Sequence, residues 1–64
     1  MNGLLIVGGT EVNVASWSGT LRTFIKDGWR AESGVLVTPG WGYPVGSIHF
    51  TLRKQGMCAE LIAS

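Results

Sequence analysis

The stretch from Thr38 to Gly46, TPGWGYPVG, most constrains what this chain can fold into, because it cannot be regular structure. Its prolines fix φ and remove backbone donors, and its glycines permit backbone conformations that other residues avoid. We therefore predict a shaped loop that carries two large aromatic side chains, Trp41 and Tyr43. Every helix or strand has to lie entirely before or entirely after this loop.

The chain is short, and residues 1–64 form a single domain. A domain of this size buries only about 60% of the surface that its unfolded chain exposes, so its stability is marginal. Disulfides, a structural metal or oligomerisation usually compensate. Cys58 is the only cysteine, which excludes an internal disulfide, and Cys58 with His49 cannot complete a zinc site within one chain. We therefore expect no metal and no other cofactor, and we predict a homo-oligomer.

The composition gives a second indication of self-association. Apolar residues make up 45% of the chain and charged residues only 14%, whereas ordinary soluble domains have about 25% charged residues. This composition excludes disorder and leaves a surface with apolar patches of the kind that mark interfaces. The net charge of +1 provides no strong electrostatic field, so neither nucleic acid nor a membrane surface is expected as a partner.

The amino-terminal segment Met1–Val7 lacks the positive region and the length of a signal peptide. The longest apolar run has four residues, far fewer than a membrane-spanning helix needs. Together with the free thiol, these features predict a cytoplasmic protein.

Hydrophobic patterning predicts two hairpins. The apolar run Leu4–Val7, the glycine pair that follows it and the alternating segment Glu11–Ser16 form the first. Ser47–Arg53 alternates apolar and polar residues and is the strongest strand signal. A turn at 54–56 then leads into 57–63, which we predict as a strand, with a short helix as the alternative because the segment is rich in helix formers.

One further strand is expected at Val35–Val37. If it pairs beside Leu4–Val7, these two apolar runs would form the centre of the sheet. A short helix should begin after Ser18, which can act as its cap, and end at Gly28. Its apolar face would present Leu21, Phe24 and Ile25 to the sheet.

These elements predict an α+β fold: a small β-rich domain with an antiparallel sheet of four to five strands, built from two hairpins, and one short helix at about 19–27 packed on one face. Trp17 and Trp29 flank the helix and are expected to clamp it to the sheet. Arg22 and Lys26 lie on its opposite face, either as a solvated surface or, extended by Arg30, as a small cationic patch.

No catalytic constellation is present in the sequence. His49 shares the polar face of its strand with Thr51 and Arg53, but acid–base catalysis needs a second placed group, and the carboxylates are scattered. We interpret His49 as a surface or pairing histidine and Cys58 as a small buried residue. The chain is therefore not expected to be an enzyme.

The candidate binding residues are Trp41, Tyr43, Trp29, Arg30 and Arg53. Three uses compete for the two loop aromatics: a folded-back core or self-interface, contact with a protein partner, or stacking on a nucleotide-like ligand whose phosphates would meet an arginine. We predict a non-enzymatic, homo-oligomeric binding protein that blocks or sequesters a partner, as an inhibitor does. Its small size is also typical of a viral or mobile-element accessory protein. The alternatives are sequestration of a nucleotide-like ligand and a structural subunit of a larger assembly.

Overall fold

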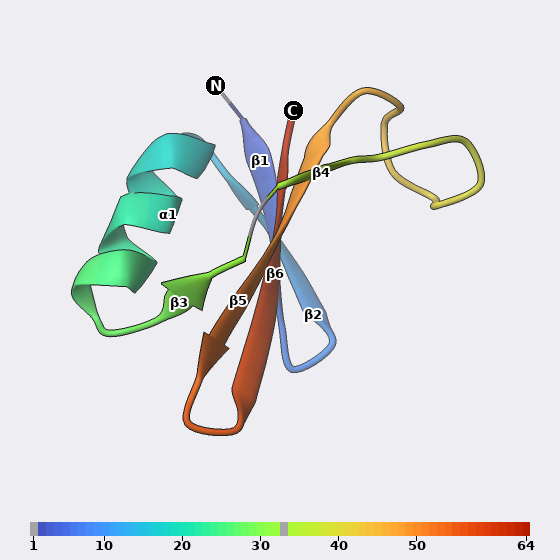
Figure 1. The fold of residues 1–64 in the computed structure, drawn as a ribbon. Coiled ribbons are helices and arrows are strands. Elements are labelled where there is room, and N and C mark those ends of the chain that lie inside the picture. Colours follow the sequence, from blue (N-terminus) through green and yellow to red (C-terminus); the bar gives the residue numbers. More distant parts are fainter. Residues whose placement is uncertain (1, 33) are drawn as a thin grey trace.

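The computed structural model describes residues 2–32 and 34–64 and contains one helix packed against one antiparallel sheet (Figure 1). The strands are β1 (Gly3–Val7), β2 (Thr10–Val14), β3 (Arg30–Ala31), β4 (Val35–Leu36), β5 (Ile48–Lys54) and β6 (Met57–Ala63), and the helix is α1 (Trp17–Lys26). The strand order is β2-β1-β6-β5-β3, with β4 also paired to β5. The α+β class is confirmed. The sheet has six strands because β3 and β4 are two separate short pieces of the same edge.

Both hairpins are confirmed, and each turns on residues with positive φ. Gly8 and Gly9 have φ values of 58° and 80°, which fit a two-residue type I′ turn, whose twist matches that of the flanking strands. Gln55 and Gly56, at 44° and 81°, make the equivalent turn between β5 and β6. Residues 57–63 are a strand, because all seven pair in continuous register with β5.

The centre of the sheet is β6, and the prediction that placed Val35–Val37 beside Leu4–Val7 is wrong. β6 lies between β1 and β5 and pairs with both. It suits this place because it is long and carries buried apolar residues on both faces, as Leu61 and Ile62 show. β4 has only two residues, Val35 and Leu36, and both are exposed on the sheet edge.

The helix begins two residues earlier than predicted, because Ser16 and not Ser18 is its N-cap. Ser16 has an extended backbone (φ −138°, ψ 106°), and its Oγ accepts a hydrogen bond from the Gly19 N–H at 3.2 Å. Ser18 lies inside the first turn. Gly28 follows the helix with φ 96°, so the predicted end of the helix is confirmed.

The Ser16 cap should contribute measurably to stability. Ser16→Ala should lower the free energy of unfolding by about 1 kcal/mol, because the Gly19 N–H loses its acceptor. Ser18→Ala is the matched control and should change stability by less than about 0.5 kcal/mol. Urea unfolding followed by far-UV circular dichroism measures both, and equal losses in the two variants would contradict the assignment of the cap.

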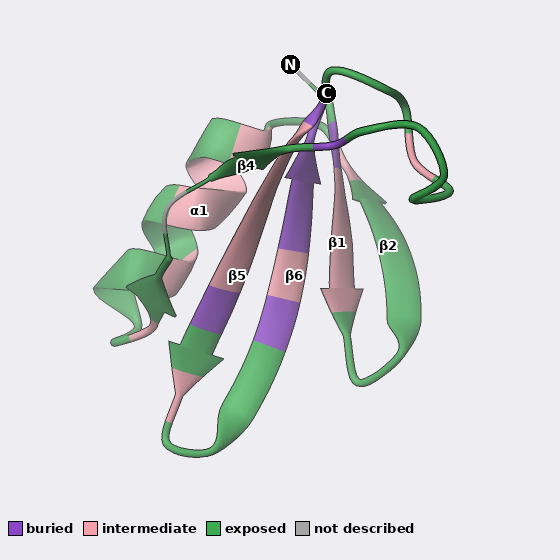
Figure 2. Cartoon of the chain, turned by 45° about the vertical axis from the view of Figure 1, so that its right-hand side comes forward, coloured by how far each residue is buried: buried purple, intermediate pink, exposed green. Residues whose placement is uncertain are grey.

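The core lies between α1 and the sheet (Figure 2). Leu52, Ala59 and Leu61 are its buried centre. Trp17 stacks on Phe50 with ring centroids 5.7 Å apart. At the other end of the helix, Trp29 meets Phe24 edge-on at 5.1 Å. The two tryptophans therefore clamp the helix, as predicted.

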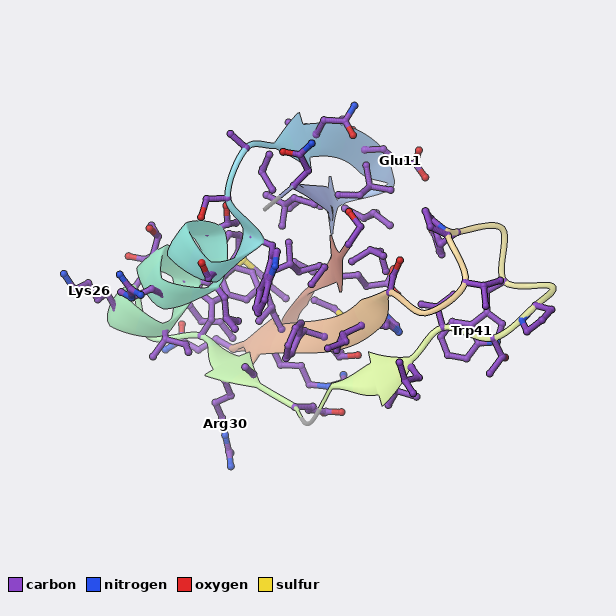
Figure 3. All side chains as sticks on the ribbon, turned by 90° about the horizontal axis from the view of Figure 1, so that it is seen from above. Glu11, Lys26, Arg30 and Trp41 are labelled. Carbon is purple, nitrogen blue, oxygen red and sulfur yellow. The ribbon has the colours of Figure 1, made fainter. Side chains whose placement is uncertain are left out.

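In the part of the chain that the structure describes, the face of the sheet opposite α1 carries a loop and no helix. Seen from above, α1 lies on one side of the sheet, and the loop that connects β4 to β5 projects on the other (Figure 3). This loop is the only cover that Figure 3 shows on that face within the described residues. Across the described ranges, no helix has the length and apolar character needed to cross a membrane.

Candidate binding surface

The loop of residues 38–46 stands on a neck that backbone hydrogen bonds close. The Val37 N–H donates to the Ser47 carbonyl at 2.8 Å, and the Gly46 N–H donates back to the Val37 carbonyl at 3.1 Å. Ser47 also ties the loop internally, because its hydroxyl donates to the Pro44 carbonyl at 2.7 Å. Val37 and Ser47 are both buried. The loop is therefore anchored at its base, although it contains no helix or strand.

Three glycines shape the loop above this neck. Gly40, Gly42 and Gly46 have φ values of 98°, 83° and 89°, in the left-handed region that residues with a side chain rarely adopt. A Cβ built at any of them would meet nothing within 4 Å. The glycines are therefore required by the path of the backbone and not by close packing.

Trp41 folds back from the loop onto His49 at the start of β5. The two ring centroids are 5.9 Å apart, with an interplanar angle of 88°. His49 is itself held by Glu60 on β6, at 2.9 Å from Nε2 to Oε1. A carboxylate can only accept, so the His49 Nε2–H donates. Glu60, His49 and Trp41 thus form a chain of contacts that orients one face of the loop. This confirms His49 as a pairing histidine.

Trp41 nevertheless stays 41% exposed, and Tyr43 is half-buried. Eight large apolar side chains are exposed in the described residues, and four of them lie in β4 and this loop: Val35, Leu36, Trp41 and Val45. No charged residue occurs in the sequence between Glu32 and His49. We call these four side chains together with Tyr43 the loop surface. It is uncharged and mainly apolar, and all five residues lie within one uncharged stretch of the sequence, 33–48.

The predicted arginines lie at the other end of β5. Arg53 is four residues beyond His49, which places it about 13 Å farther along the strand. Arg30 pairs directly with Arg53 across β3 and β5. The structure therefore divides the predicted binding residues: Trp41 and Tyr43 lie on the loop, and the arginines border a separate groove.

This groove has a volume of about 750 Å³ and is lined mainly by the ends of β3 and β5. The Arg53 Nε donates to Glu32 Oε1 at 2.7 Å, and this hydrogen bond raises the pKa of the exposed Arg53 side chain above its ordinary value. Lys54 donates to the Asp27 carbonyl at 2.6 Å. Within residues 2–32 and 34–64, Arg30 makes no side-chain hydrogen bond or ion pair. The groove therefore has one unpaired cation, which is a weak basis for holding a phosphate.

The remaining candidates are structural or separate. Trp29 is half-buried and packs against the core, apart from Trp41 and Tyr43. Lys26 points away from the sheet, whereas Arg30 points from its edge (Figure 3), so these two cations do not form one patch.

The prediction that Cys58 is buried is wrong. It is exposed and pairs with Arg53 near the hairpin turn, on the face away from α1. His49 pairs with Ile62, four residues from Cys58, so the two are not brought together. Among the residues that the structure describes, no group of three or more metal-ligating side chains occurs.

Val35, Leu36 and Val45 are surface residues that the sequence did not identify. The uncharged run from 33 to 48 was the available signal, because a core strand and its turns seldom extend so far without a charge. Comparison with known proteins yields no relationship: no family model, no curated protein and no solved structure matches the chain.

Proposed function

We propose that this chain is a non-enzymatic binding protein whose loop surface inserts into an uncharged cleft of a partner protein and blocks it. The observation that carries the proposal is the exposure of Trp41 and Val45, at 41% and 67%, on a loop that is anchored at its base. Exposed aromatic and aliphatic side chains that cluster on one surface mark sites of contact.

Anchoring matters because ordering a loop on binding costs free energy. The neck between Val37 and Ser47 and the contact of Trp41 with His49 hold the loop before any partner arrives. A rigid aromatic side chain presented in this way has the properties of a binding hot spot.

The chemistry of the loop also defines the partner. A charged group buried against an uncharged surface would lose its hydration without gaining a counterion. The partner cleft should therefore be apolar and free of unpaired charges. A nucleotide-like ligand fits less well, because Arg53 lies about 13 Å along the strand from His49 and already pairs with Glu32. The proposal places the chain in the cytoplasm, where an exposed thiol such as Cys58 stays reduced.

Photo-crosslinking in the cells that naturally make this protein tests the proposal directly. Val45 is replaced by p-benzoylphenylalanine, and Arg22 on the exposed face of α1 receives the same group in a control chain. Mass spectrometry should find one predominant partner protein linked through position 45 and not through position 22. Identical products from the two positions would overturn the proposal.

The identified partner then allows a quantitative prediction. Trp41→Ala should weaken binding at least about tenfold, since central aromatic residues dominate interface energetics. Calorimetry with the purified partner measures the affinity. Ile25→Ala is the matched control: Ile25 was predicted to face the sheet but is instead an exposed apolar residue (52%) on the helix, and the affinity of this variant should be unchanged. Val45→Ser provides a second loop variant that leaves the Trp41–His49 contact in place, and equal affinities for all of these chains would contradict the prediction.

A further inference from the structure

The two edges of the sheet are built differently. The β3/β4 edge consists of two strands of two residues each, with Arg30 and Glu32 along it. Short, interrupted and charged edges resist pairing with another chain. The β2 edge has five residues in unbroken register with β1, and it contains neither proline nor lysine. Figure 3 shows nothing beyond β2 on that side of the sheet. β2 is therefore the unprotected edge.

The hydrogen-bonding groups that β2 leaves free follow from its register. Val7 and Thr10 flank the two-residue turn and so form its closing hydrogen-bonded pair. Because such pairs alternate along an antiparallel ladder, Thr10, Val12 and Val14 direct their backbone groups toward β1. The backbone N–H and C=O groups of Glu11 and Asn13 therefore point outward from the sheet.

We propose that β2 pairs antiparallel with β2 of a second copy of this chain, about a two-fold axis at Val12. In this register Glu11 lies opposite Asn13 of the second copy, and each such pair exchanges both of its backbone hydrogen bonds. The outward-facing groups are thus the ones that the pairing needs. The edge is complementary to itself.

The side chains favour the same register. Val12 meets its own copy at the axis, where a non-hydrogen-bonded pair brings the Cα atoms to about 4.5 Å, and Val12 is 50% exposed in the single chain. Thr10 faces Val14, and the Glu11 carboxylate faces the Asn13 amide. An axis at Glu11 would place like charges opposite each other, which is destabilising. An axis at Asn13 would leave part of the strand unpaired, because β2 ends at Val14.

Pairing of one five-residue strand buries a small surface area compared with the roughly 1,200–2,000 Å² that stable interfaces bury. We therefore expect a dimer that dissociates on dilution. A two-fold axis perpendicular to the sheet extends it across both copies and keeps both helices on one face. The dimer uses the backbone edge of β2, whereas the loop projects over the face opposite α1 (Figure 3), where Pro44 shares a hollow with Leu4 and Asn13. The pairing therefore uses backbone groups that do not belong to the loop surface, and it does not depend on the proposed function.

Sedimentation velocity from about 10 μM to about 1 mM tests the dimer across the range expected for a small interface. The wild-type chain should pass from monomer to dimer with concentration. Val12→Lys should weaken the dimer at least about tenfold, because two like charges would meet at the axis. An equimolar mixture of Val12→Lys and Val12→Glu chains should restore it. Val7→Lys is the matched control, because Val7 is similarly exposed (44%) on the same face but lies on β1 and not on the edge.

Amide exchange on the wild-type chain gives a readout that needs no variant. The Glu11 and Asn13 amides should become protected as the concentration rises, while those of Gly8 and Gly9 should not. A monomer at every concentration would overturn the proposal. So would a dimer that survives Val12→Lys, or one in which the protected amides lie outside β2.

Discussion

Replacing Leu61 with alanine is expected to cost about 2–5 kcal/mol of the free energy of unfolding. Leu61 is fully buried at the centre of the sheet, where it pairs with Leu5 on one side and Phe50 on the other. The cavity would open between β6 and α1, where surrounding side chains cannot collapse without moving the helix. A domain of 64 residues holds only about 3–10 kcal/mol in total. The variant should therefore be largely or partly unfolded at physiological temperature.

Leu36→Ala makes the same chemical change on an exposed edge strand and serves as the control. Leu36 is 63% exposed, so its truncation should alter stability by less than about 0.5 kcal/mol. Urea denaturation at low protein concentration, where the chain is monomeric, compares the two variants without a contribution from association. Similar losses at the two positions would mean that β6 is not the central strand.

The hairpins could be predicted because local rules determine them. Gly8-Gly9 supplies the positive φ values of a type I′ turn, and the alternation of Ser47–Arg53 separates a buried face from an exposed one. Both signals lie within a few residues of the structure that they specify. The end of the helix at Gly28 is likewise determined locally, by a glycine with positive φ.

The strand order could not be predicted, because it depends on contacts between distant parts of the chain. Val35–Leu36 and Leu4–Val7 are both apolar runs, and nothing in their composition says which of them lies beside β6. β1 takes that place because all five of its residues pair with β6, whereas β4 offers only two residues for pairing. The exposure of Cys58 has a similar origin, since only the assembled sheet shows that its face is uncovered there.

The candidate site was predicted in part. The loop aromatics Trp41 and Tyr43 lie in an irregular segment, as their glycines and prolines indicated. The predicted grouping of these aromatics with Arg30 and Arg53 does not hold, because each residue of β5 adds about 3.3 Å between the loop and the arginines. Contact of Trp41 with His49 depends on how the loop folds back, which no local pattern encodes.

The two proposed surfaces have a joint consequence. Each copy in the β2-paired dimer would present its own loop surface on the face of the joined sheet opposite the helices. A partner with two copies of the cleft could then be bound at both, and the second binding event would benefit from a high effective concentration. Val12→Lys should therefore reduce the apparent affinity for such a partner while leaving the affinity for a single cleft unchanged.

Gly3→Ala should lower the free energy of unfolding by about 1–3 kcal/mol, because the site has no room for a methyl group. An added Cβ would lie 2.8 Å from the Trp17 Cβ and 3.0 Å from the Ile62 carbonyl oxygen. Neither atom belongs to a flexible side-chain end, so the start of α1 would have to move off the sheet. Urea unfolding measures the loss, and a red shift in tryptophan fluorescence would report the displacement of Trp17.

The contrasting variant in the same hairpin is Gly8→Asn. Gly8 has φ 58° and open space around it, and asparagine is favoured at this position of a type I′ turn. The stability of this variant should therefore be unchanged or slightly higher. A Gly3→Ala chain as stable as the wild type would show that Trp17, at the start of α1, does not pack against Gly3 of β1.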